Sequence, residues 1–126
     1  MRTPVESLDV WQLSHTMALE IYRTTKDFPK EERYGLAAQV RRAAVGIPAN
    51  IAEGNARNSL REYVHFCHLA RGSLAELRYL LRLARDLGLI DETTFEACTD
   101  GYDRVGKMLH YLIIGLRKRS QQNGSA

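Results

Sequence analysis

Hydrophobic residues recur at spacings of three and four along four stretches of the chain, at about residues 8–26, 31–55, 59–87 and 92–119. This spacing places them on one face of an α-helix, and no stretch has the alternating pattern of a β-strand. Four amphipathic helices joined by short turns are typical of an all-α, antiparallel up-down-up-down four-helix bundle. We therefore expect residues 1–126 to form a single domain, with an ordered core of about residues 8–118 and a disordered tail over about 120–126.

Polar residues and prolines mark the ends of the expected helices. Pro29 ends the first helix, because proline cannot continue it. Ser59 and Glu62 have the spacing of a capping box at the start of the third helix, Gly88 is typical of the residue that ends a helix, and Asp91 is a good N-cap for the fourth. Pro48 lies inside the second helix and removes one backbone hydrogen bond, so we expect a kink near Pro48 within one continuous helix.

The third and fourth helices carry more hydrophobic residues than one buried face needs. The surplus forms a second stripe, made of Phe66, Leu69, Leu80, Leu83 and Leu87 in the third helix and of Met108, Tyr111, Ile113 and Ile114 in the fourth. A stripe of this kind has to be covered by packing, so the pattern predicts self-association. The alternative is that both helices lie at the centre of a compact monomer and bury the wide stripe there.

Arginine is unevenly distributed along the chain. Residues 33–85 contain nine arginines, no lysine, no aspartate and three glutamates, although the formal net charge of the whole chain is only +3. Arginine forms paired hydrogen bonds to phosphate and to carboxylate, so this bias fits contacts to RNA or DNA, arginine–glutamate pairs between subunits, or an unselected surface. Few aromatic residues lie among these arginines, which favours contacts to the phosphate backbone over base stacking. The candidate contact residues for nucleic acid or a protein partner are Arg41, Arg42, Asn50, Glu53, Arg57, Arg61, Ser73 and Glu76.

No combination of residues indicates catalysis, a cofactor or a metal. Cys67 and Cys98 fall at apolar helical positions, where we expect buried free thiols. Glu62 and His65 form one Glu-x-x-His motif, whereas a di-iron bundle needs two. The chain has no glycine-rich phosphate loop, no segment long and apolar enough to span a membrane, and no N-terminal apolar run of a signal peptide. We therefore expect a cytoplasmic protein that is not an enzyme.

Several short segments occur in an order that resembles a known family. They are Leu8–Gln12, Phe28–Glu32, Tyr34–Leu36, Gln39–Val45, Ile47–Gly54 and Gly72–Leu77. Over about residues 8–118 the chain is similar to the proteins encoded in intervening sequences of 23S ribosomal RNA, also called the S23 ribosomal protein family. The run Arg-Arg-Ala-Ala followed by Ile-Pro-Ala-Asn-Ile-Ala-Glu-Gly is highly specific. One departure is Gly46, where the resemblance leads us to expect serine before Ile-Pro.

The resemblance implies a four-helix bundle that assembles into a ring-shaped homopentamer, and it supplies no catalytic residues. The molecular function of the family is unsettled, so two hypotheses remain open. In the first, an oligomer binds RNA or DNA through an arginine-rich face that includes Arg41, Arg42, Arg57 and Arg61, and the basic segment Arg117–Arg119 is a further candidate for the same contact. In the second, a protein–protein scaffold uses the same arginines for contacts between subunits.

Overall fold

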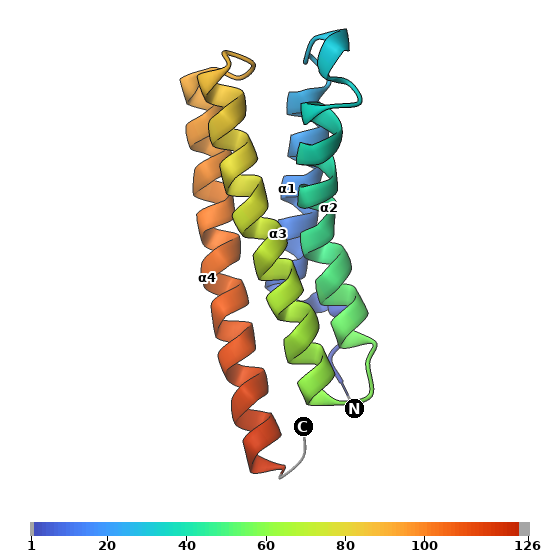
Figure 1. Ribbon diagram of the computed structural model, residues 1–126. Coiled ribbons are helices and arrows are strands. Elements are labelled where there is room, and N and C mark those ends of the chain that lie inside the picture. The colour runs from blue at the N-terminus through green and yellow to red at the C-terminus, as the bar shows by residue number, and fades with distance from the viewer. Residues whose placement is uncertain (1, 124–126) are drawn as a thin grey trace.

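The computed structural model describes residues 2–123, and in this part of the chain it contains four α-helices, two short 3-10 turns and no strand. The helices are α1 (Asp9–Thr25), α2 (Leu36–Asn55), α3 (Leu60–Asp86) and α4 (Glu92–Gln122), and the 3-10 turns are η1 (Val5–Ser7) and η2 (Lys30–Glu32). The four helices pack lengthwise against one another (Figure 1). The prediction of an all-α four-helix bundle is therefore confirmed.

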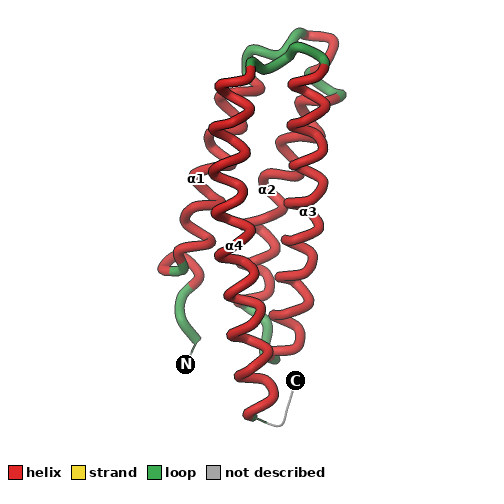
Figure 2. Tube along the Cα trace, turned by 90° about the vertical axis from the view of Figure 1, so that its left-hand side faces the viewer, coloured by secondary structure: helices red, strands yellow, loops and turns green. Residues whose placement is uncertain are grey.

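Each helix packs on two neighbours, in the order α1, α2, α3, α4 and back to α1. Figure 1 shows the α1–α2 and α3–α4 connections at one end of the bundle and the α2–α3 connection at the other. Near the latter end, α4 extends beyond the neighbouring end of α3 (Figure 2). The N-terminal segment lies there too, because Arg2 donates hydrogen bonds to the carbonyl oxygens of Asn55, at 2.8 Å, and Arg57.

The helix ends that local sequence predicted are confirmed for α3 and for the start of α4. The backbone N–H of Glu62 donates to Ser59 Oγ at 3.1 Å, and the backbone N–H of Thr94 donates to Asp91 Oδ1 at 2.7 Å. Beyond the C-terminal end of α3, Gly88 adopts a φ of 77°, in the left-handed region that favours glycine. Local interactions within a few residues thus mark both ends of α3 and the start of α4.

The start of α2 differs from the prediction, because the helix begins at Leu36 and not near Glu31. The 3-10 turn η2 occupies the predicted first turn, and Gly35 separates it from α2 with a non-helical φ of −101° and ψ of −110°. The carboxylate of Glu32 accepts a hydrogen bond from the N–H of Leu36 at 3.2 Å. A side chain from outside the helix thus satisfies one of its free N–H groups.

The end of α4 corrects the expected disordered tail over residues 120–126. The helix continues through Gln122, so residues 120–122 are helical. Serine and glutamine do not break a helix, and the first glycine of the tail comes only at position 124. Residues 124–126 of the expected tail lie outside the described residues.

Pro48 lies within α2, which is one continuous helix as predicted. The proline is buried, and its missing N–H leaves the carbonyl oxygen of Ala44 without its usual helical donor. The expected bend at this point stays a prediction.

Two glycines of α2 lie directly against α3. A Cβ atom at Gly46 would lie 2.6 Å from Ser73 Oγ, and one at Gly54 would lie 2.8 Å from the Cβ of Phe66. Both distances are shorter than a non-bonded contact allows, so the two helices approach as closely as they do only with glycine at these positions. The contact with Ser73 also explains why glycine stands at position 46 in place of the expected serine.

The hydrophobic faces that the residue spacing predicted form the core of the bundle. Leu77 and Leu109 are fully buried there. Cys67 and Cys98 are buried free thiols, as predicted. Desolvation by burial raises the pKa of the Cys67 thiol to about 12, so it carries no thiolate near neutral pH.

The second hydrophobic stripe is divided between the core and the surface. Leu80 and Ile113 are buried in the core, at 4% and 2% exposure. Phe66, Leu83, Met108 and Ile114 are half-buried. Leu69, Leu87 and Tyr111 remain exposed, at 44%, 57% and 71%. The bundle therefore covers part of the surplus itself and leaves part of it on the surface.

Candidate nucleic-acid interface

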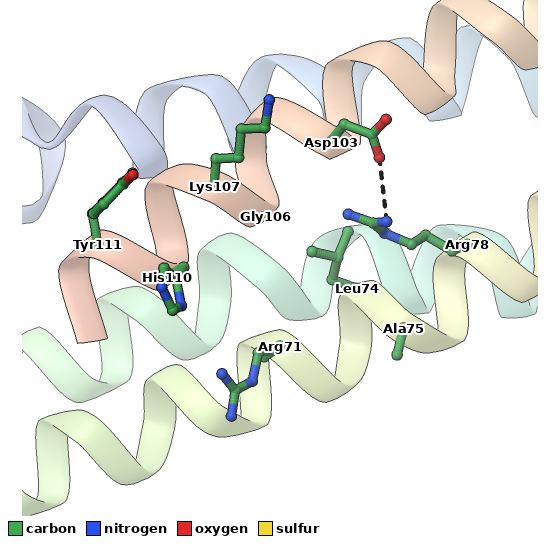
Figure 3. A pocket seen from close by; sticks show the side chains of 9 residues that line it. All are labelled: Arg71, Leu74, Ala75, Arg78, Asp103, Gly106, Lys107, His110 and Tyr111. Atoms are coloured by element: carbon green, nitrogen blue, oxygen red, sulfur yellow. Dashed lines mark ion pairs between the residues drawn. The ribbon is translucent and has the colours of Figure 1, made fainter. Parts of the chain in front are cut away.

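A hollow of about 720 Å³ lies between α3 and α4 (Figure 3). Its lining residues are Arg71, Leu74, Ala75 and Arg78 from α3, and Asp103, Gly106, Lys107, His110 and Tyr111 from α4. Figure 3 shows His110 projecting from α4 on the side of α3, and Arg78 reaching across from α3 to Asp103. Gly106 lets the side chains of Arg78 and Leu74 approach α4 closely. A Cβ atom at position 106 would lie 2.9 Å from an Arg78 guanidinium nitrogen and 3.3 Å from Leu74 Cδ2.

A second hollow of about 270 Å³ lies on the same two helices, and its lining residues are Arg61, Val64, Arg117, Ser120 and Gln121. His68 joins the two hollows, since it contacts Arg71 of the first and Arg117 of the second. We call the two hollows and His68 together the α3–α4 groove. From Arg61 to Arg78 it follows α3 for about 26 Å, given the helical rise of about 1.5 Å per residue.

The α3–α4 groove is strongly basic. Its only carboxylate is Asp103, which pairs with Arg78 at 3.2 Å. Its four other cations have no carboxylate within 4.0 Å among residues 2–123, and they are Arg61, Arg71, Lys107 and Arg117. Guanidinium and ammonium groups gathered along one depression attract anions and repel one another. The arrangement therefore suits a long polyanion better than a single small substrate.

His68 lies between two guanidinium groups. Its ring nitrogens Nδ1 and Nε2 lie 2.9 Å from Arg71 Nη2 and 2.8 Å from Arg117 Nη2. Partial desolvation, followed by the charges of Arg71, Arg117 and His65, lowers the pKa of His68 below its ordinary value. The imidazole is therefore neutral near pH 7 and lies between two permanent positive charges.

Two of the predicted contact residues, Arg41 and Arg42, lie instead on a groove of about 660 Å³ between α1 and α2. Arg41 is tied to α1, because its Nε donates to Thr25 Oγ1 at 2.7 Å and its guanidinium lies 4.6 Å from the ring centre of Tyr22. The exposed rings of Tyr22 and Tyr34 line the same groove, at 45% and 87% exposure. The expectation that few aromatic residues lie near these arginines is wrong here, because the fold brings Tyr22 in from α1.

Four of the other predicted contact residues follow the line where α2 packs on α3, and most are occupied within the protein. Asn50 donates to the carbonyl oxygen of Gly46 at 2.7 Å, and Ser73 lies against Gly46. Glu53 and Arg57 form an ion pair at 2.8 Å. The Arg57 guanidinium also lies over the ring of Phe66, at 4.7 Å from its centre. Interactions within the chain thus account for Asn50, Glu53 and Arg57, and Ser73 packs against Gly46.

The remaining two predicted residues, Arg61 and Glu76, are exposed on α3. Only Arg61 lies in the α3–α4 groove. The predicted residues are therefore spread over several surfaces and do not form one cluster. Arg117, which the sequence offered as part of the basic segment Arg117–Arg119, also lies in this groove. Sequence reasoning did not select Arg71 or Lys107, although their basic character was visible.

No group of three or more histidine, cysteine, aspartate or glutamate side chains among residues 2–123 is placed to hold a metal ion. Over the same residues, none of the helices combines the length and the apolar character that crossing a membrane requires.

Comparisons with known proteins agree on one family. Residues 6–111 match the family model described as 23S rRNA-intervening sequence protein. A search of curated proteins gives no match. Among solved structures, the chain is similar to a protein of unknown function of the S23 ribosomal protein family from Bacteroides thetaiotaomicron, with a TM-score of 0.74 and 21% sequence identity. That likeness covers 82% of this chain and 97% of the other, and at this identity it shows the shared fold alone.

Proposed function

The chain belongs to the family of 23S rRNA-intervening sequence proteins, and from that premise we propose that it is a homo-oligomeric binding protein, not an enzyme, that holds nucleic acid by its phosphate backbone. The observation that carries the proposal is the α3–α4 groove, where Arg61, Arg71, Lys107 and Arg117 have no carboxylate partner among the described residues. All four side chains are exposed along one depression, where their charges add and attract an anion.

The backbone of the nucleic acid, and not its base sequence, is the expected point of contact. Guanidinium groups match the geometry of phosphate oxygens, and such contacts carry no sequence information. Tyr111 is the one tyrosine among the lining residues, and it is 71% exposed, so base stacking has a minor part beside the phosphate contacts. The groove length of about 26 Å exceeds the rise of several nucleotides, at roughly 3.4 Å each along a duplex strand.

Salt dependence of RNA and DNA binding tests this proposal. Fluorescence anisotropy of labelled mixed-sequence oligonucleotides is measured from about 50 to 200 mM salt for the wild type, Arg61→Gln and Lys107→Gln. Arg104→Gln is the matched control, since Arg104 is exposed on α4 and lines no part of the groove. Each groove variant should weaken binding to all sequences alike and reduce the log–log salt slope by about 0.7 for a single strand. A wild type that binds neither RNA nor DNA at about 50 mM salt overturns the proposal, because electrostatic attraction is strongest there.

A scaffold whose arginines contact neighbouring subunits is the second candidate. It is favoured by the apolar surface that remains uncovered, since Leu69 and Leu87 are 44% and 57% exposed. In a scaffold, Arg61→Gln and Lys107→Gln would dissociate the oligomer, and the wild type would not bind nucleic acid. Measuring the mass of each variant beside its affinity therefore separates the two functions. We expect the assembly to be a pentamer, in keeping with the family resemblance.

A further inference from the structure

The contacts of His68 with Arg71 and Arg117 cannot both be hydrogen bonds in the neutral ring. All the nitrogens of a guanidinium donate and none accepts, and a neutral imidazole accepts at only one of its two nitrogens. Yet each ring nitrogen lies within 3 Å of a guanidinium nitrogen, at 2.9 Å for Nδ1 and 2.8 Å for Nε2. Whichever tautomer is present, one contact therefore sets an N–H group of His68 against an N–H group of an arginine.

Among residues 2–123, no negatively charged group near His68 offsets this repulsion. The charged and titratable groups that act on the ring are Arg71 and His65 from α3 and Arg117 from α4, with none from α2. Neither Arg71 nor Arg117 has a carboxylate within 4.0 Å among the described residues. The cluster thus combines two permanent cations and a third group that becomes cationic on protonation, at the point where the two hollows of the groove meet.

We propose that Arg71, His68 and Arg117 form a binding site for one phosphate group, and that His68 takes up a proton when the phosphate binds. This inference rests on the proposed function, because in a bound strand the phosphate is one phosphodiester of the backbone. Phosphate oxygens accept from both guanidinium groups in short, charge-assisted hydrogen bonds. The anion also stabilises the imidazolium form, in which both ring nitrogens donate. A phosphate beside the three side chains therefore accepts from both guanidinium groups and from one ring N–H of His68, and its charge offsets the repulsion among the three cations.

The sign of the pH dependence follows from linkage. In the free protein, burial and the neighbouring arginines lower the pKa of His68, and a bound phosphate raises it again. Phosphate binding then raises the affinity for the proton, and protonation raises the affinity for phosphate by the same factor. Binding is expected to tighten as the pH falls from about 8 to about 5.5, by at most about tenfold per pH unit for one proton.

The test compares His68→Asn with the wild type in two measurements. The first is the affinity for a fluorescein-labelled thymidine 20-mer at about pH 5.5 and about pH 8, at constant ionic strength. The second is the NMR titration of the histidine rings with and without inorganic phosphate. His15→Asn is the matched control, because His15 is exposed on α1, where its ring stacks on Trp11. His110 also lines the groove, and it is unchanged in both variants.

We expect the wild type and His15→Asn to bind the oligonucleotide several-fold more tightly at the lower pH, and His68→Asn to lose most of that gain. Inorganic phosphate should raise the pKa of one ring, and that resonance should be absent from His68→Asn. If the oligonucleotide binds equally well to all three proteins at both pH values, this inference fails and the proposed function stands. If the oligonucleotide does not bind but phosphate still shifts His68, the site takes free phosphate and the proposed function fails. If neither probe has an effect, both are overturned, and an acidic protein segment becomes the ligand to examine for the groove.

Discussion

Asp91 shows how one side chain fixes a helix end and makes stability depend on pH. The N–H of Thr94 donates to its carboxylate, and this hydrogen bond lowers the pKa of Asp91 in the folded protein. A lowered folded pKa means that the contribution is complete above the unfolded pKa of about 3.9 and is lost as the pH falls through the folded value. Asp91→Ala should therefore melt at a lower temperature than the wild type near neutral pH, and the difference should shrink in acid.

Circular dichroism melts at about pH 7 and about pH 3 measure this difference. Asp100→Ala is the control, because Asp100 is exposed in the middle of α4 and caps no helix. A gap between Asp91→Ala and the wild type that is the same at both pH values would contradict the role of the ionised carboxylate.

The hydrophobic core can also be tested at the level of single residues. Leu77 and Leu109 have no exposed surface, so an aspartate at either position buries an unpaired charge. The cost of several kcal/mol is comparable to the whole stability of a domain of this size, which is about 5–15 kcal/mol. Leu77→Asp and Leu109→Asp should each abolish cooperative thermal unfolding. Leu87→Asp, at a position that is 57% exposed, should melt nearly as the wild type does. If Leu77→Asp melts as the wild type does, position 77 does not lie in the core.

At the scale of elements, sequence predicted what depends on short-range chemistry. The caps at Ser59 and Asp91 and the left-handed Gly88 involve residues within a few positions of each helix end, so the sequence alone located them. The start of α2 was misplaced because Glu31 and Glu32 look like the first turn of a helix. In the structure, Glu32 acts from outside α2 as the acceptor for the N–H of Leu36.

The α2–α3 contact carries a prediction of its own. A side chain at position 46 would overlap Ser73, so Gly46→Ser should destabilise the bundle by about 1–3 kcal/mol through overpacking. The double variant Gly46→Ser/Ser73→Gly moves the hydroxymethyl group to the other helix and should recover much of the loss. Gly72→Ala is the control, because nothing lies within 4 Å of its added Cβ, and it should stabilise α3 by roughly 0.5–1 kcal/mol.

Urea unfolding of the four proteins gives these free energies. A double variant no more stable than Gly46→Ser would mean that the strain at position 46 comes from the backbone of α3 and not from Ser73. A Gly72→Ala variant that is destabilised would instead indicate that position 72 is covered by a neighbouring subunit.

For the whole molecule, the fold was predictable and the site largely was not. The arginine bias was visible in the sequence, but the arginines of one sequence segment lie on different surfaces of the bundle. Arg41 and Arg42 lie on the α1–α2 groove, whereas Arg61 lies on the α3–α4 groove. The cluster at His68 needs Arg117, which is 49 residues away in sequence and on another helix. That contact depends on the register of α3 against α4, which hydrophobic spacing does not specify.

Leu69 offers a test of self-association. Leu69 is 44% exposed and lies one helical turn from Ser73, beside the contact of α3 with α2. An oligomer that covers this side of α3 removes the leucine from water, so Leu69→Asp should dissociate the assembly and leave the helix content unchanged. Leu19→Asp on α1, at 45% exposure, is the matched control and should stay assembled.

Sedimentation equilibrium at roughly 10–50 micromolar protein measures both variants, because mass action favours assembly in this range. The wild type should sediment as a multiple of its 14.3 kDa chain mass, and a pentamer is the expected multiple. A dissociated Leu69→Asp should also lose the extra affinity that the assembled wild type has for long over short oligonucleotides, because a ring presents several grooves to one strand and a monomer presents one. A wild type of monomer mass would contradict the assembly, and an assembled Leu69→Asp would place the subunit contact on another face.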